Sequence, residues 1–181
     1  MPLILLDRDG VILRHVEGYL HRPEQVEFLP GSLDALAQLA HAGYHIAIVT
    51  NQAALSRGVL EISTVNAIHQ RMVRQVEAAG GRIDTIAICP HGPDQRCDCR
   101  MPLPGLLNQV RERFDVAPAD TVMVGDALHE IEAGVAAGAS TWLVRGGNPE
   151  ASVAAGDLPA GVQVADDLSD VVTRVLAPVA T

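Results

Sequence analysis

A short run of large apolar residues near the start of the chain is followed directly by aspartates. The run Leu3-Ile4-Leu5-Leu6 shows no polar alternation, which indicates a strand buried on both faces, as in the centre of a parallel sheet. Asp7 and Asp9 come next, and Gly10 allows the backbone to turn sharply after them. In an open α/β sheet the ligand crevice lies beyond the carboxyl ends of the strands, so we expect both carboxylates there. Taken alone, Asp7-Arg8-Asp9-Gly10 fits a plain polar turn equally well.

The rest of the chain repeats this unit of a buried strand followed by a helix. Apolar runs predict further strands at 45–49, 85–88, 121–124 and 140–144, with a short edge strand at 162–164. Helical spacing of apolar residues predicts helices at about 32–43, 63–80, 104–114, 130–137 and 171–176. Ser63 is expected to cap the second of these helices. Repeated βα units with short links favour a doubly wound, mostly parallel α/β sheet of Rossmann type.

Composition sets limits on the class of protein. The 181 residues suffice for one buried core, and no linker divides them, so we expect a single domain over 1–181. A formal net charge of −9 argues against a nucleic-acid-binding surface, which needs clustered basic residues. No apolar stretch approaches the length of a membrane span, and no signal segment is visible at the amino end. We therefore expect a cytoplasmic monomer without a nucleic-acid or membrane partner.

The ends of three predicted strands carry small polar or acidic residues. Asp7 and Asp9 follow the first strand, Thr50 and Asn51 end the second, and Asp126 follows the strand at 121–124. If these strands are neighbours, the side chains converge on one pocket. A cluster of carboxylates suits Mg²⁺, which in turn binds phosphate oxygens, so the pattern predicts hydrolysis of a phosphate ester. A dinucleotide site is a weaker alternative, because the sequence has neither G-x-G-x-x-G nor a P-loop motif.

All three cysteines fall in one short window. Cys89 and His91 form one pair and Cys97 and Cys99 another, with five residues between the pairs. Four such ligands are the number that a closed structural Zn²⁺ site requires. Buried free cysteines are the alternative, since the common C-x-x-C spacing is absent.

Several of these motifs resemble those of a known family. The segments Asp7-Arg8-Asp9-Gly10-Val11-Ile12, Val49-Thr50-Asn51-Gln52 and Val124-Gly125-Asp126 resemble the first, second and fourth motifs of the haloacid dehalogenase (HAD) superfamily of phosphatases. Arg57-Gly58 and the cysteine segments narrow the resemblance to the D-glycero-D-manno-heptose-1,7-bisphosphate 7-phosphatase and histidinol-phosphatase group. The resemblance covers nearly the whole chain. It implies a HAD core without an inserted cap domain, and a loop braced by zinc.

The resemblance also implies roles for individual residues. Asp7 would attack phosphorus and form an aspartyl-phosphate, and Asp9 would act as general acid and base. Mg²⁺ would lie between the Asp7 carboxylate, the Asp9 backbone carbonyl and Asp126. Zn²⁺ would be held by the cysteines and His91. The residues expected to bind the substrate or its phosphate are Thr50, Asn51, Gln52, Arg57 and Arg100.

The sequence departs from the family pattern at two positions. Met101 stands where the third motif has a lysine, and Leu103 offers no substitute for that charge. Glu130 takes the place of a second aspartate after Asp126 and is a possible accessory group at a metal-bound water.

Two hypotheses for the function therefore remain. One is a Mg²⁺-dependent phosphatase of a small sugar phosphate, most like the enzyme that removes the 7-phosphate in the synthesis of heptose precursors for lipopolysaccharide or another glycan, with histidinol phosphate as the alternative substrate. The other is a weakly catalytic phosphate-binding protein.

The stretch 11–29 has no clear periodicity. It contains His15, Tyr19 and His21, and we expect it to cover or border the crevice.

Overall fold

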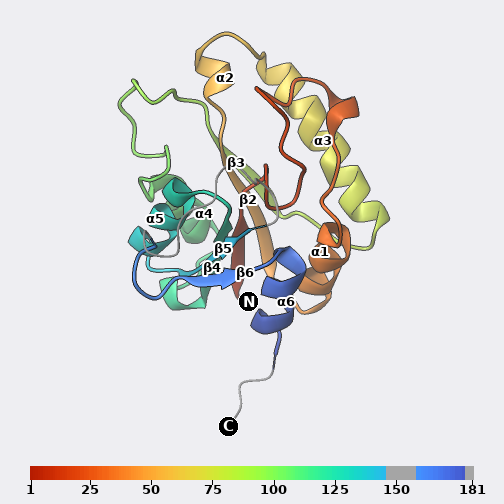
Figure 1. Cartoon of the computed structure of the whole chain (residues 1–181), viewed down its shortest axis with the longest axis vertical. Helices are drawn as coiled ribbons and strands as arrows, with labels where there is room; N and C mark the ends of the chain where they lie inside the picture. Colours follow the sequence, from red (N-terminus) through yellow and green to blue (C-terminus); the bar gives the residue numbers. More distant parts are fainter. Residues whose placement is uncertain (146–157, 178–181) are drawn as a thin grey trace.

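The structure is a computed structural model that describes residues 1–145 and 158–177. Its centre is one six-stranded sheet with strand order β3-β2-β1-β4-β5-β6, and every pair of neighbours is parallel (Figure 1). The predicted doubly wound α/β fold is confirmed. The strands are β1 (Leu3–Leu6), β2 (His45–Asn51), β3 (Thr85–Cys89), β4 (Thr121–Gly125), β5 (Ser140–Val144) and β6 (Gln163–Ala165).

Helices cover both faces of the sheet (Figure 1). Ile4 and Leu6 of β1 pack with helices on one face, and Leu3 and Leu5 pack with helices on the other. This is why β1 reads as an unbroken apolar run. The first face carries α1 (Ser32–His41), α3 (Ile62–Ala78) and α6 (Leu168–Val175), and the second carries α4 (Gly105–Arg113) and α5 (Leu128–Ala136).

The register of β1 determines where its following residues emerge. Leu6 lies beside Ile48 of β2 and Val124 of β4. The backbone N–H of Asp7 then donates to the carbonyl of Val124 at 3.0 Å. Asp7 therefore leaves the sheet between the carboxyl ends of its two neighbouring strands, at the switch point where α/β folds bind ligands.

The connections differ in places from the predictions. Between β2 and β3, residues 52–84 contain only α2 (Ala53–Ser56) and α3, so no cap domain is inserted there, as predicted. The short α2 was not predicted. The stretch 11–29 is irregular apart from the 3-10 turn η1 (Pro23–Gln25), and a second such turn, η2 (Pro118–Asp120), precedes β4.

Three helix starts were predicted wrongly. The α6 helix begins at Leu168 rather than at residue 171, because Asp167 caps it. The α3 helix begins at Ile62 after Glu61, and no side chain caps it, because Ser63 already lies inside the first turn and donates to the Glu61 carboxylate at 3.3 Å. The α5 helix begins at Leu128 rather than at Glu130. Glu130 instead accepts from the backbone at the start of the helix, which is why it reads as a start signal in the sequence.

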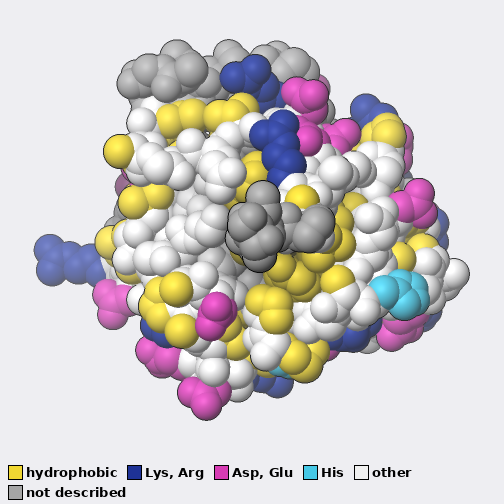
Figure 2. All heavy atoms as spheres, turned by 90° about the horizontal axis from the view of Figure 1, so that it is seen from below, with side chains coloured by type: hydrophobic (Ala, Val, Ile, Leu, Met, Phe, Trp, Pro, Cys, Tyr) yellow, Lys and Arg dark blue, Asp and Glu magenta, His cyan; other side chains and the backbone are white. Residues whose placement is uncertain are grey.

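Figure 2 shows the face at the amino ends of the strands, opposite the predicted crevice, where acidic and basic side chains are interspersed around apolar ones. Within the described residues, no helix combines the length and apolar character needed to cross a membrane.

Candidate active site

A cavity of about 220 Å³ lies beyond the carboxyl ends of β1, β2 and β4. Each of the three polar strand ends singled out in the sequence contributes to its wall. The cavity, called the acidic pocket below, is lined by Asp7, Asp9, His15, Thr50, Asn51, Asp126, Ala127, His129 and Glu130.

Three buried carboxylates meet in this pocket. Asp7, Asp126 and Glu130 are each at most 7% exposed, and one oxygen of each lies within 4.8 Å of the others. Burial, together with the charges of Asp9 and Asp126, raises the pKa of Asp7 well above its usual value. Burial also raises the pKa of Asp126 to about 6. Burial and the charges of Asp7 and Asp126 raise the pKa of Glu130 well above its usual value. The acids disfavour one another's ionisation, so they fit a divalent cation held by oxygen ligands such as Mg²⁺.

Glu130 has a second role besides its place in the acid cluster. One of its oxygens, Oε2, accepts from the backbone N–H of Asp126 at 2.9 Å and of Ala127 at 3.2 Å. A Cβ at position 125 would lie 2.6 Å from both Cβ and Oε2 of Glu130, so Gly125 is needed for this approach. Glu130 thus fixes the turn that carries Asp126. Its other oxygen, Oε1, lies 3.4 Å from Nε2 of His129.

Asp9 is held from one side by its own neighbour. Arg8 donates through Nε to Asp9 Oδ1 at 3.1 Å and through Nη2 to Asp9 Oδ2 at 2.7 Å. The Arg8 side chain is 2% exposed, whereas that of Asp9 is 28% exposed. The Asp9 carboxylate therefore has a fixed orientation and still faces the accessible part of the pocket.

The end of β2 supplies amide and hydroxyl groups. Gln52 donates through Nε2 to the Thr50 hydroxyl at 3.1 Å. The side chain of Asn51 pairs with the backbone of Met101: its Nδ2 donates to the Met101 carbonyl at 3.1 Å, and the Met101 N–H donates to its Oδ1 at 3.2 Å. Asn51 therefore ties β2 to the loop after the cysteines, in addition to lining the acidic pocket.

A second cavity of about 160 Å³ adjoins the acidic pocket and shares Asp9, His15 and Asn51 with it. Tyr19 lines this second cavity, so two of the three aromatic or imidazole groups expected at the crevice do border it. His21 instead bonds its ring to the carbonyl of Tyr19 in an exposed position. The two cavities thus share part of their walls, on the side where Asp9 lies.

The four predicted zinc ligands lie together. Cys89 Sγ is 3.1 Å from Cys99 Sγ and 3.9 Å from Cys97 Sγ, and His91 Nδ1 is 3.3 Å from Cys99 Sγ. All four ligand atoms fall within 4.8 Å of one another, and none of the cysteines is in a disulfide. Tetrahedral coordination at Zn–S distances of about 2.3 Å places ligand atoms at such separations. The donor set fits Zn²⁺, with no open position for a reacting water.

We expect the purified protein to contain one Zn²⁺ per chain, because a closed set of four soft or borderline ligands binds zinc tightly. Elemental analysis of protein prepared without added zinc, together with titration of the three thiols before and after chelation, measures this. Cys97→Ser is expected to lower the zinc content and the melting temperature. Zinc-free protein with three freely reactive thiols would contradict the prediction.

Comparisons with known proteins agree with this geometry. A family model for HAD-hydrolase-like proteins matches residues 98–171. The D-glycero-β-D-manno-heptose-1,7-bisphosphate 7-phosphatase of Bordetella bronchiseptica is 43% identical over 97% of this chain and 98% of its own length. The chain belongs to the HAD superfamily, in the branch that contains the heptose-bisphosphate phosphatases.

A second relative and a solved structure are also similar to this chain. The D-glycero-α-D-manno-heptose-1,7-bisphosphate 7-phosphatase of Mycobacterium bovis is 39% identical over 83% of both chains. The crystal structure of the Bordetella bronchiseptica heptose bisphosphate phosphatase, complexed with magnesium and phosphate, superimposes with a TM-score of 0.93 over 97% of this chain and 98% of that one. The predicted membership of a phosphatase family and the predicted HAD fold are therefore confirmed.

The structure shows where the side chains of the third-motif segment lie. Met101 is 2% exposed and packs in the apolar cluster that includes Cys89 and Leu106, while Leu103 is 48% exposed. The whole chain contains no lysine, so no ammonium group reaches the acidic pocket from any element.

The two arginines expected at the substrate do not line the acidic pocket in the described structure. Arg57 donates to the hydroxyl of Tyr19 at 2.7 Å, beside the second cavity. Arg100 donates to the backbone carbonyl of His91 at 3.0 Å. Both residues belong to segment 89–101, which carries the four predicted zinc ligands and is called the zinc loop below. Burial and the charge of Arg100 lower the pKa of His129, which lines the acidic pocket.

The sequence interpretation missed His129, which lines the acidic pocket and lies with Nε2 3.4 Å from Glu130 Oε1. Its position directly before Glu130 was the available signal. The sequence interpretation also assigned no role to Arg8, although Asp7 and Asp9 on either side of Arg8 line the acidic pocket.

Proposed function

We propose that this chain is a Mg²⁺-dependent phosphatase that removes the 7-phosphate of D-glycero-β-D-manno-heptose 1,7-bisphosphate. The observation that carries the proposal is the meeting of Asp7, Asp9, Asp126 and Glu130 in one pocket at the switch point of the sheet. The β-anomer is chosen because the 43% identical relative has that name, whereas the 39% identical relative is named for the α-anomer. The product would feed the synthesis of heptose precursors for lipopolysaccharide or another glycan.

Asp7 is the proposed nucleophile. One of its carboxylate oxygens attacks phosphorus, the bond from phosphorus to the sugar oxygen breaks, and an aspartyl-phosphate results. Water then attacks the phosphorus of this acyl phosphate, the bond from phosphorus to the Asp7 oxygen breaks, and inorganic phosphate leaves, which restores the Asp7 carboxylate. Its burial and the hydrogen bond from its backbone N–H to Val124 support this role, because both restrict its position.

Asp9 is the proposed general acid and base. It protonates the departing sugar oxygen in the first step and takes a proton from water in the second, a contribution of roughly 10²–10⁴ in rate. Its partial exposure lets it face both a leaving group and solvent. Thr50, Asn51 and Gln52 at the end of β2 are proposed to bind phosphoryl oxygens, and Arg57 and Arg100 to bind the outer part of the substrate.

Mg²⁺ would be held by Asp7, Asp126 and the backbone carbonyl of Asp9, with Glu130 as an accessory acid. When bound, it supplies positive charge that lets an anionic carboxylate approach an anionic phosphate. The raised pKa values of the three buried acids support a cation at this place.

Two alternatives remain open to the same experiment. Histidinol phosphate is the alternative substrate, since the sequence motifs are shared with that group. A weakly catalytic phosphate-binding protein is the alternative in function, and Met101 is the observation that favours it.

The test is phosphate release from both anomers of the heptose bisphosphate, from heptose 7-phosphate and from histidinol phosphate, with Mg²⁺ and with a chelator. We expect the β-bisphosphate to give the largest kcat/KM, with release of one phosphate, and activity to require Mg²⁺. A larger kcat/KM for histidinol phosphate would reassign the substrate. Binding of inorganic phosphate without turnover of any compound would favour the hypothesis of a phosphate-binding protein.

We further propose that residues 1–181 act as one domain and as a monomer in the cytoplasm. The described strands all join one sheet, and three unpaired cysteines are typical of a reducing compartment. Elution of the purified protein at a mass other than that of one 19.1 kDa chain would contradict the monomer.

A further inference from the structure

Arg8 connects Asp9 to a helix far away in the sequence. Its Nη1 lies 3.1 Å from Nε2 of His69, while its Nε and Nη2 are engaged by Asp9. His69 is 9% exposed and belongs to α3, on the face of the sheet that α1 and α6 also cover. A continuous chain of contacts thus runs from α3 through Arg8 to the acidic pocket.

The direction of the hydrogen bond between Arg8 and His69 follows from chemistry. A guanidinium has only donors, so Nε2 of His69 must accept, and the imidazole proton must be on Nδ1. Burial and the charge of Arg8 lower the pKa of His69 to about 4, so the ring is neutral at physiological pH. A neutral ring in one fixed tautomer is what this contact requires.

The contact with His69 matters because Arg8 is almost completely buried. A buried guanidinium donor without an acceptor carries a desolvation cost, which would favour another orientation of the whole group. Because Arg8 and Asp9 are adjacent in the chain, their two-point contact requires one particular orientation of the guanidinium. An acceptor on the far side of the guanidinium keeps it there.

We infer that His69 is a positioning residue: by accepting from Arg8 through Nε2, it holds the guanidinium that orients the Asp9 carboxylate. The inference rests on the proposed role of Asp9 as general acid and base. It assigns to α3 a task in the reaction besides covering the sheet.

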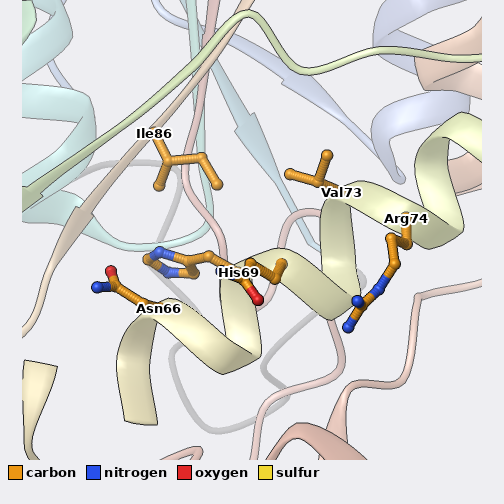
Figure 3. A pocket seen from close by; sticks show the side chains of 6 residues that line it. Asn66, His69, Val73, Arg74 and Ile86 are labelled. Carbon is orange, nitrogen blue, oxygen red and sulfur yellow. The ribbon is translucent and has the colours of Figure 1, made fainter. Parts of the chain in front are cut away.

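The alternative is that His69 only packs. Figure 3 shows His69 on α3 near Asn66 and Ile86, at an open cavity of about 480 Å³ that is lined by residues of α3 and by Ile86 of β3. An apolar residue of similar size would satisfy a packing role, and space is available beside it. An apolar residue would leave Nη1 of Arg8 without its acceptor, so the two roles can be separated by substitution.

The matched variants are His69→Gln and His69→Leu. Glutamine places an oxygen near the position of Nε2 and can accept from Arg8, whereas leucine fills the space without an acceptor. With the substrate that the parent hydrolyses best, we expect His69→Leu to lower kcat roughly 10-fold with KM within about twofold of the parent. His69→Gln should keep kcat within about threefold of the parent. An unchanged kcat in His69→Leu, or an equal loss in both variants, would overturn the inference.

A second measurement does not depend on turnover. Nitrogen-15 NMR of the histidine rings in the parent should show His69 protonated on Nδ1 and unprotonated on Nε2 from pH 5 to pH 8. A ring protonated on Nε2 would overturn the inference even in an active enzyme. If the parent hydrolysed no phosphate ester, the proposed function would fail, and the NMR result would still decide whether His69 accepts from Arg8.

Discussion

Asp7→Asn is expected to fold normally and to lose roughly 10³-fold or more of kcat/KM, because an amide cannot attack phosphorus. Asparagine has nearly the shape of aspartate, and the contact of the Asp7 backbone with Val124 does not involve the side chain. The substitution also removes one charge from a buried cluster of acids, so the melting temperature of the metal-free protein should stay the same or rise. Steady-state kinetics with the preferred phosphate ester and thermal unfolding measure the two effects.

Asp120→Asn is the matched control for this variant. It makes the same chemical change on the exposed turn η2, directly before β4 and therefore at the opposite end of the strands from the acidic pocket. Its kinetics should equal those of the parent. Turnover by Asp7→Asn within about tenfold of the parent would contradict the covalent mechanism and would leave Asp7 as a metal-binding residue only.

Much of the fold could be predicted because it depends on local patterns. Unbroken apolar runs identified the strands, since a strand buried on both faces has no polar alternation. Helix boundaries were less certain, because the same polar residue can end one element or act inside the next. Ser63 and Glu130 both read as start signals, yet both lie within the first turn of their helices.

The convergence of Asp7, Thr50 and Asp126 could also be predicted, because parallel strands place their carboxyl ends at one edge. The contact of Arg8 with His69 could not, since it depends on how α3 packs against the end of β1. The use of the Asn51 side chain to hold the Met101 backbone likewise depends on where the zinc loop returns to the sheet. The spacing of residues in the sequence carries no information on such contacts between distant segments.

Met101 stands where the resemblance to the third motif implies a lysine. Both its backbone N–H and its carbonyl are fixed by Asn51, which itself lines the acidic pocket. Its side chain is 2% exposed and packs with the zinc-loop cysteines. The backbone of Met101 is therefore tied to a residue of the pocket wall, whereas its thioether supplies packing but no charge.

Met101→Lys is expected to raise kcat/KM, by up to roughly 10²-fold if the ammonium reaches the acids and the phosphoryl oxygens. Lysine has a flexible four-carbon stem, so its ammonium group can leave the apolar cluster that holds the methionine side chain and turn toward the pocket. The raised pKa values of Asp7 and Glu130 indicate that the site gains from added positive charge. Steady-state kinetics on the preferred substrate at saturating Mg²⁺ measure the gain.

Two further variants decide the source of positive charge. Met101→Leu changes the side chain without adding charge and should leave kcat/KM within about threefold of the parent. Arg100→Ala should lower kcat/KM if this arginine, whose charge lowers the pKa of His129 in the pocket wall, compensates for the missing lysine. A folded Met101→Lys variant without a gain, together with an unaffected Arg100→Ala variant, would mean that charge on this loop does not contribute to catalysis. The buried acids and their cation would then account for the chemistry without help from the third motif.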